Sequence, residues 1–277
     1  MRRRGFALVE LVVALVIAGI IGASLARLVI NQSRFVSLQD GMMRARSGAR
    51  AALNVMQDEL RMVTDSGLRA ASRDSVTVRV PFVFGIACGY SAGRTVVALV
   101  PADSASVASA TASGMAWRDS VGNWRFVEPA TMTSGAPTGT CWAQTPTIWV
   151  MSTTDWPSRA VYGTGIVPPI GSPIYFYQTV TYAFSPSVDL PGRRALWRAV
   201  PATSVREELV APFDTSARFE FLVASPPSPR VTPPAILDSV LGVRVRLVAA
   251  SDQTPAGRSQ PVTFDLTTTL LFRNHAH

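Results

Sequence analysis

The chain has 277 residues, of which 48% are hydrophobic and 16% charged, and its formal net charge is +8. This composition supplies enough apolar side chains for a folded core and excludes a wholly disordered chain. All 26 basic residues are arginines, and beyond the N-terminus they form no dense run. We interpret them as scattered, solvated side chains, so nucleic acid is not indicated as a partner.

The first thirty residues combine a basic cap with a long apolar run. Three arginines at positions 2–4 precede Gly5, and residues 6–26 carry a single charged side chain, that of Glu10. A secretory signal peptide has a shorter apolar region followed by a cleavage site. A carboxylate inside a transmembrane helix costs about 2.5–3.5 kcal/mol on insertion scales, so Glu10 needs a partner. The run therefore predicts a membrane helix that carries a functional acid.

The segment Arg4-Gly5-Phe6-Ala7-Leu8-Val9-Glu10 resembles the class III leader of type IV prepilins and type II secretion pseudopilins. The resemblance implies that a membrane prepilin peptidase and N-methyltransferase cuts between Gly5 and Phe6 and methylates the new N-terminus. It also implies that Glu10 pairs with the Phe6 amine of a neighbouring subunit. Such a pair would offset the cost of burying the acid and would set the stagger of a fibre. The alternative is a plain signal anchor with a chance Glu10.

Two positions depart from the family pattern. Ala7 stands where the family often has Thr, and Arg27 stands where many major pilins have a helix-kinking Pro. The second departure favours a minor subunit over a major pilin.

The arginines before the apolar run are expected to stay in the cytoplasm under the positive-inside rule. We therefore expect a single-pass inner-membrane protein with an exported head, which is periplasmic, or extracellular once in a fibre. In that compartment Cys88 and Cys141, the two cysteines, are expected to form a disulfide. It would stabilise the head by about 4 kcal/mol in the chain-entropy model. The alternative is a pair of buried free thiols.

The helical pattern continues beyond the membrane segment to about Val63, because apolar residues recur there at spacings of three, four and seven. It predicts one long helix, or two nearly collinear ones, docked on a globular head rather than paired as a coiled coil. Gly41 and Gly48 are candidate bending points, and Gly19 and Gly22 permit close approach of membrane helices. The predicted stripe comprises Leu28, Phe35, Leu38, Met42, Ala45, Ala49, Leu53, Met56, Leu60 and Val63.

Strand patterns fill the rest of the chain, separated by a turn region at 64–74, a loop at 101–115, a short turn at 207–209 and a proline-rich link at 224–234. Residues 174–184 and 194–200 are expected to form a hairpin. The predicted strands are Ser75–Phe84, Thr95–Val100, Trp124–Val127, Thr147–Met151, Ile174–Phe184, Arg194–Val200, Arg218–Val223, Leu241–Ala249 and Pro261–Phe272.

The order of the last elements resembles the C-terminal half of W-type minor pilins and J-type pseudopilins. The resemblance implies a pilin-like α+β fold, in which the long N-terminal helix packs on an antiparallel β-sheet head. The expected organisation is a leader at 1–5, a transmembrane helix at 6–30, its amphipathic continuation at 31–66, and a β-rich head at 67–277 with an irregular insertion at about 85–173. The shared residues are Tyr182, Leu196, Trp197, Arg198, Glu208, Leu209, Val210, Arg273 and Asn274.

No set of residues predicts catalysis. The only histidines, His275 and His277, lie in a terminal tail, and two ligands make an incomplete metal site. Glu207 and Glu208 would point to opposite faces of a strand. Asp58, Glu59 and Arg61 are interpreted as a helix-surface charge cluster, and core packing is the preferred role of the tryptophans over a carbohydrate surface. We expect no enzyme, cofactor or metal. The tryptophans are Trp117, Trp124, Trp142, Trp149, Trp156 and Trp197.

We interpret the chain as a structural minor pilin that enters a type IV pilus or related fibre, near the tip, after cleavage by prepilin peptidase. Its expected partners are that peptidase, other pilins or pseudopilins, the inner-membrane assembly platform and membrane lipid. One alternative is a type II secretion pseudopilin. A signal-anchored, exported binding module is another, and an anchored hydrolase is a third that the histidine distribution disfavours.

Overall fold

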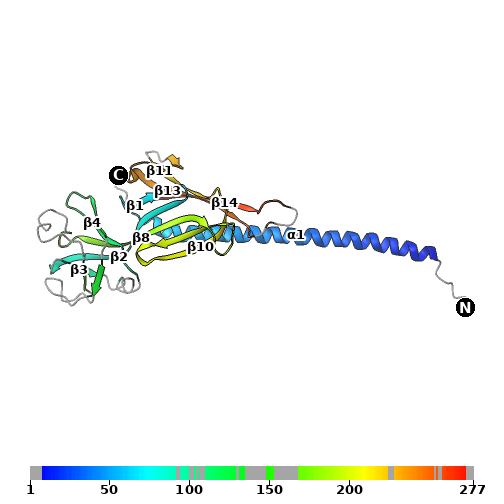
Figure 1. The fold of residues 1–277 in the computed structure, drawn as a ribbon, viewed down its shortest axis with the longest axis horizontal. Helices are drawn as coiled ribbons and strands as arrows, with labels where there is room; N and C mark the ends of the chain where they lie inside the picture. The colour runs from blue at the N-terminus through cyan, green and yellow to red at the C-terminus, as the bar shows by residue number, and fades with distance from the viewer. Residues whose placement is uncertain are drawn as a thin grey trace.

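In the computed structural model, a single long helix carries a β-sheet head. The structure describes residues 8–91, 94–99, 103, 106, 110–128, 131–134, 148–152, 168–223, 228–252, 254 and 258–272. Helix α1 spans Leu8–Leu60, 53 residues, which is about 80 Å at 1.5 Å per residue. Figure 1 shows its N-terminal half projecting from the head and its C-terminal half lying along the sheet. The predicted α+β architecture, a long helix packed on an antiparallel sheet, is confirmed.

Fourteen strands and two short 3₁₀ turns follow the helix within the described residues. They are β1 (Leu68–Ala71), β2 (Ser75–Ser91), β3 (Arg94–Leu99), β4 (Gly114–Arg118), β5 (Trp124–Val127), β6 (Thr131–Ser134), β7 (Ile148–Ser152), β8 (Pro173–Pro186), β9 (Arg194–Val200), η3 (Pro201–Thr203), β10 (Val205–Phe213), β11 (Arg218–Val223), β12 (Ser228–Arg230), η4 (Leu237–Ser239), β13 (Val240–Ala250) and β14 (Thr263–Leu271).

The strands form one antiparallel sheet in the order β12-β11-β13-β10-β9-β8-β2-β3-β7-β6. Beside this path, β1 pairs with β2, β14 with β13, and β4 with both β5 and β8. The predicted hairpin is confirmed as β8 and β9, in which Thr181 lies opposite Ala199. Chain neighbours pair in β8–β9–β10 and in β13–β14, so much of the sheet needs only short connections.

The main core lies between α1 and the inner face of the sheet. Strand β13 alternates as predicted: Val243, Val245 and Leu247 are fully buried, while Arg244 and Arg246 lie on the outer face. The helix contributes small residues and two larger ones to this core, because small side chains let the helix backbone approach the strands. The fully or almost fully buried helix residues are Ala45, Ala49, Ala52, Met56 and Leu60.

A second, smaller core lies at the end of the head away from the helix N-terminus. Strands β2 and β8 are long enough to serve both cores, and β3 to β7 are built on their distal portions (Figure 1). Trp117, Met115 and Phe176 fill the centre of this second cluster. The segment expected to hold an irregular insertion therefore contains five strands, three of which match predicted ones.

The helix differs from the sequence prediction in one respect. Leu28 and Phe35 belong to the predicted stripe but are 53% and 61% exposed, because contact with the head begins only near Leu38. The helix runs unbroken through Gly41 and Gly48, and bending near them stays a prediction. A Cβ on Gly48 would lie 3.1 Å from Val210 Cγ1, and one on Gly41 would lie 3.0 Å from Ser251 Cβ. At both glycines the helix backbone lies close to the head, so a larger side chain would have little room there.

Three strands, β1, β4 and β10, differ from the sequence prediction. The expected turn at 207–209 lies inside β10, whose pairing with β9 shifts register twice, so its alternation is disturbed. Strand β1 lies in the expected turn region at 64–74 and has only four residues. Strand β4 begins at Gly114, within the expected loop at 101–115. Short or bulged strands carry too few alternating positions to be recognised.

Strand β2 also extends past its predicted end through a glycine. A Cβ on Gly85 would lie 2.5 Å from Val97 Cγ1 and 2.8 Å from the Ala98 carbonyl oxygen of β3. The missing side chain therefore lets β2 and β3 approach each other closely.

A test of the helix–sheet core compares two methionines on the same helix. Met56 is fully buried, whereas Met43 is 67% exposed. Because removing a buried methionine side chain leaves a cavity, Met56→Ala should lower the free energy of unfolding by about 2–5 kcal/mol. Met43→Ala should change it by no more than about 0.5 kcal/mol. Urea unfolding of the full chain in detergent, followed by tryptophan fluorescence, measures both; equal effects would contradict this packing.

Candidate assembly site on the N-terminal helix

The residues predicted to be processed precede the described part of the chain. Gly5 and Phe6 fall within residues 1–7, so cleavage between them stays a prediction. Glu10 lies in the first turn of α1, and its side chain is exposed. A carboxylate at this end of a helix interacts favourably with the positive end of the helix dipole.

The projecting half of α1 exposes apolar side chains all round the helix, with Glu10 and Arg27 as its charged residues. All large hydrophobic side chains in residues 8–30 are exposed, from 48% for Val12 to 80% for Leu8. Among the described residues, α1 is the one helix long and apolar enough to cross a membrane. Burial of so much apolar surface is strongly favourable, so this half requires lipid or other apolar helices around it.

Two glycines in that half, Gly19 and Gly22, leave places on the helix surface without a side chain. A Cβ placed on Gly19 or Gly22 would meet no heavy atom within 4 Å. The head therefore does not use these positions, unlike Gly41 and Gly48. Glycines that no part of the chain covers are suited to close contact with a second helix.

The helix is tied to the sheet by a polar contact near its C-terminal end. The Tyr182 hydroxyl donates to Glu59 Oε2 at 2.7 Å, and Arg198 Nη2 donates to Glu59 Oε1 at 2.8 Å. Tyr182 is in β8 and Arg198 in β9, so one carboxylate joins the helix to two strands. The Arg198 and Glu59 side chains are only 18% and 20% exposed, which strengthens the ion pair relative to a surface pair.

The protonation of this cluster follows from its surroundings. Burial, and then the neighbouring Glu59 carboxylate, raise the pKa of the Tyr182 hydroxyl well above its ordinary range, so it remains a donor. Burial would lower the pKa of Arg198, but its hydrogen bonds and ion pair with Glu59 outweigh burial and raise it. Glu59 was expected to belong to a surface cluster with Arg61, and that assignment is wrong, because the carboxylate turns inward to Arg198.

A second carboxylate supports the distal end of the head. Glu128 accepts from Arg79 Nε at 3.0 Å and from the Tyr177 hydroxyl at 2.9 Å. The Arg79 guanidinium also lies 3.9 Å from the centre of the Phe126 ring, a cation–π contact. Burial would raise the pKa of Glu128, but its hydrogen bond and charge attraction with Arg79 outweigh burial and lower it.

A third carboxylate is buried on the outer face of the sheet. The Glu220 side chain is 4% exposed and pairs with Arg218 Nη2 at 2.7 Å and with the Arg244 guanidinium. Burial would raise the pKa of Glu220, but hydrogen bonds from Arg244 and then Arg218 outweigh it, so the pKa falls below its ordinary value of 4.5. Sequence alternation places Arg244 on this face but does not identify its partner.

Two of the C-terminal residues that the sequence resemblance singles out, Glu208 and Trp197, make structural contacts within the head. Glu208 accepts from the Val188 backbone N–H at 2.7 Å and from the Ser187 hydroxyl, and it thereby orders the turn between β8 and β9. Trp197 Nε1 donates to the Pro186 carbonyl oxygen at 3.1 Å. The resemblance singles out these positions, and the structure shows the contacts that they make.

Several predicted site residues are separated from this helix or lie outside the described residues. Cys88 is in β2 and half-buried, while Cys141 lies outside the described residues, so their disulfide stays a prediction. His275, His277, Trp142 and Trp156 also lie outside. Trp117 is 1% exposed in the distal core, as the core-packing interpretation expects.

The fold combines a β-sheet head with a helix that is long and apolar enough to cross a membrane and that the head covers only in part. Residues 1–26 match a family model described as the prokaryotic N-terminal methylation motif. No curated protein and no solved structure shows significant similarity to the chain. The match covers the N-terminus and the apolar start of α1, the segment that resembles the class III leader of type IV prepilins and pseudopilins. The leader implies processing by prepilin peptidase and assembly with other pilins.

A test of the helix–sheet tie uses neighbouring acids. Glu59→Gln should lower the free energy of unfolding by about 2 kcal/mol, because it removes the charge from a half-buried, hydrogen-bonded pair. Asp58→Asn, at the exposed position next to it, should have little effect. A double-mutant cycle with Arg198→Gln should give a coupling energy of about 1–3 kcal/mol. Urea unfolding measures all four proteins, and additive effects of the two substitutions would exclude the tie.

A test of the Glu220 pair uses pH. Because the folded-state pKa of Glu220 is depressed, its contribution is present above the unfolded value near 4.5 and is lost as pH falls through the folded value. Glu220→Gln should therefore cost about 2 kcal/mol at pH 7, and the difference from the unsubstituted protein should shrink below pH 4. Glu207→Gln, whose side chain is 54% exposed, is the control. A difference that does not vary with pH, measured by thermal unfolding, would contradict the assignment.

Proposed function

We propose that this protein is a minor pilin, a structural subunit that enters a type IV pilus or related fibre near its tip. The observation that carries the proposal is the conjunction of the N-terminal methylation motif at residues 1–26 with a helix whose apolar half the head leaves uncovered. A soluble globular protein would bury such a surface within itself.

The proposed route begins in the inner membrane, with the head exported. Prepilin peptidase cuts between Gly5 and Phe6 and methylates the freed Phe6 amine. The Glu10 carboxylate then pairs with the Phe6 amine of a neighbouring subunit. Because both charges lie in an apolar environment, the pair stabilises only the arrangement that brings them together. That requirement sets the axial offset between neighbouring helices.

Entry into the fibre exchanges one apolar environment for another. The apolar side chains of residues 8–26 leave the bilayer and pack against sister helices, so little hydrophobic free energy is lost. Gly19 and Gly22 allow those helices to approach closely. The head travels with the helix because their shared core and the Glu59–Arg198 pair join them. We further propose that a Cys88–Cys141 disulfide stabilises the distal part of the head.

A type II secretion pseudopilin is the second candidate, because the same motif and the same helix serve both assemblies. The replacement of the expected proline by Arg27 leaves α1 unbroken and favours a minor subunit in either assembly. The class to which the motif belongs is structural rather than catalytic, and we propose no enzymatic activity. The expected partners are the peptidase, other pilins and the inner-membrane assembly platform.

The proposal is tested by replacing Glu10. Intact-mass analysis of the unsubstituted protein and of Glu10→Val should show both chains beginning at methylated Phe6. Glu10→Val should reach the fibre fraction in roughly tenfold lower amount or less, because the Phe6 amine of the neighbour loses its counter-charge. Asp40→Val, which removes an exposed acid from the same helix beyond the membrane, should assemble normally.

Two outcomes would exclude the proposal. A chain that is intact, or cut downstream of Gly5, would show that the leader is not processed as proposed. Normal incorporation of Glu10→Val would show that the acid has no role in assembly.

A further inference from the structure

The side of α1 that contacts the head carries small apolar residues at the level of the head and polar residues in the part of the helix that precedes it. Ala45, Ala49 and Ala52 are buried against the sheet, at 3% exposure or less. Eighteen residues, or five helical turns, before each of them stand Arg27, Asn31 and Arg34. These three polar residues, here called the basic stripe, therefore lie on the head-facing side of the helix but beneath the head, and they are all exposed.

The basic stripe begins where a bilayer would end. Residues 8–26, which are apolar except for Glu10, span about 28 Å of α1, close to the thickness of the hydrocarbon core. Arg27 then falls at the outer boundary, and Arg34 lies about 10 Å further along the helix. Contact with the head begins near Leu38, and Ser251 lies close to Gly41. A layer about the depth of lipid head groups thus separates the hydrocarbon boundary from the head.

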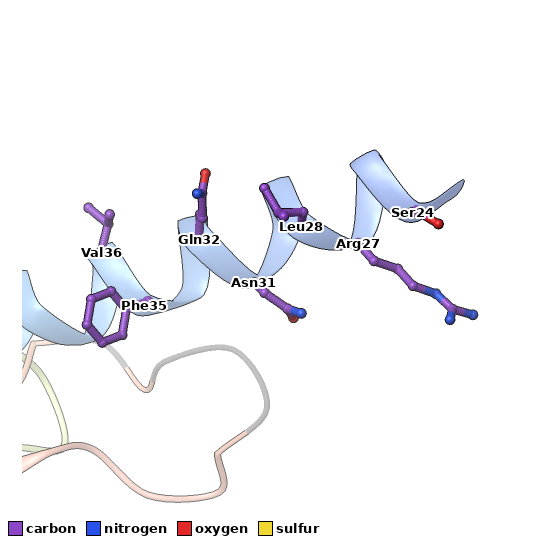
Figure 2. A pocket seen from close by; sticks show the side chains of 7 residues that line it. All are labelled: Ser24, Arg27, Leu28, Asn31, Gln32, Phe35 and Val36. Carbon is purple, nitrogen blue, oxygen red and sulfur yellow. The ribbon is translucent and has the colours of Figure 1, made fainter. Parts of the chain in front are cut away.

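Figure 2 shows Arg27 and Asn31 projecting to the same side of α1. They line a shallow hollow on the helix surface together with Ser24, Leu28, Gln32, Phe35 and Val36. Arg27 and Arg34 form no ion pair within the described residues. At the lower edge of the head, Asp252 lies 3.4 Å from Arg44 Nη1, so its charge is offset.

Helix geometry also aims the stripe at the membrane. Side chains on an α-helix lean toward its N-terminus, so the Arg34 guanidinium is directed back toward the bilayer surface. Phe35 lies one residue later and is 61% exposed, at the depth where aromatic side chains favour the membrane interface. Guanidinium groups bind phosphate oxygens through paired N–H donors, and an asparagine amide can add another.

We propose that the basic stripe is a binding site for the phosphate of an anionic lipid in the outer leaflet of the inner membrane, held beneath the head. The proposal rests on the membrane anchoring in the proposed function. The bound phosphate pairs with Arg27 and Arg34 while the subunit waits in the membrane. Because α1 is unbroken from the stripe to the head, this contact also fixes the height and tilt of the head above the bilayer.

In this proposal, entry of the subunit into the fibre also requires release of the bound lipid. A subunit that leaves the bilayer must give up its lipid phosphate along with its hydrocarbon contacts. The site therefore favours the waiting state over premature release, and the assembly machinery must supply the difference. A carboxylate on a neighbouring subunit is the competing partner for the same arginines, and the experiment separates the two.

The test measures lipid binding to the full-length chain, purified in detergent, by native mass spectrometry. The probes are phosphatidylglycerol, which is anionic, and phosphatidylcholine, which is zwitterionic. The unsubstituted protein should retain phosphatidylglycerol preferentially. Arg27→Gln and Arg34→Gln should each lower that affinity about fivefold, as expected for one arginine at an anionic surface. Arg50→Gln, which removes an exposed arginine at the level of the head, is the matched control and should leave binding unchanged.

Several outcomes would overturn the proposal. Equal retention of the two lipids, or equal losses in Arg50→Gln, would show that the stripe is not a specific site. Competition by inorganic phosphate at the same concentration as lipid would indicate a free-anion site. In reconstituted membranes that also contain partner pilins, a photo-cross-linker at position 31 should capture lipid. Capture of protein alone would indicate that the arginines pair with a carboxylate on a neighbouring subunit. Leader processing, measured separately by intact mass, should be unaffected by either arginine substitution, so a failure of lipid binding can be distinguished from a failure of the proposed function.

Discussion

The contact between the alanine face of α1 and the inner face of the sheet is the constraint on which the rest of the structure depends. Ala49, Ala52 and Met56 are fully buried there, and Gly48 brings the helix within van der Waals contact of β10. Small residues permit the close approach, and Glu59 then reaches Tyr182 and Arg198 on two strands. Because the helix is joined to the head along one half only, its other half remains free for a different environment.

That division explains how one helix can serve two states. The apolar projecting half has no partner in the head within the described residues, so lipid and sister helices are interchangeable neighbours for it. Glu10 and the basic stripe mark the two ends of this half. In the proposed function the acid favours a neighbour that brings an amine, and in the proposed lipid site the arginines favour a neighbour that brings a phosphate. Together they bias where the helix lies along its axis in each state.

Sequence patterns predict the elements of this fold well where they are long and periodic. The helix and strands such as β11 and β13 follow apolar spacing directly. The shorter or bulged strands β1, β4 and β10 do not, because a four-residue strand or a shifted register leaves too little alternation to read. The candidate assembly site can also be predicted from the sequence, because Gly5, Phe6 and Glu10 have the spacing of a class III leader and stand beside an apolar run. The partner of Glu59 has no local signal, because Arg198 lies 139 residues away.

The sequence by itself determined the leader, the membrane helix and the apolar face of its continuation, because these features depend on local spacing and composition. Only the tertiary structure decided where along α1 the head begins, which acids are buried, and that β3, β4 and β5 build a second core with the ends of β2 and β8. Those features depend on contacts between residues far apart in the chain. Leu28 and Phe35 are exposed because the sheet does not extend as far as their positions along the helix. The apolar pattern of the helix is the same in the covered and uncovered parts, so the sequence alone does not show where the covered part begins.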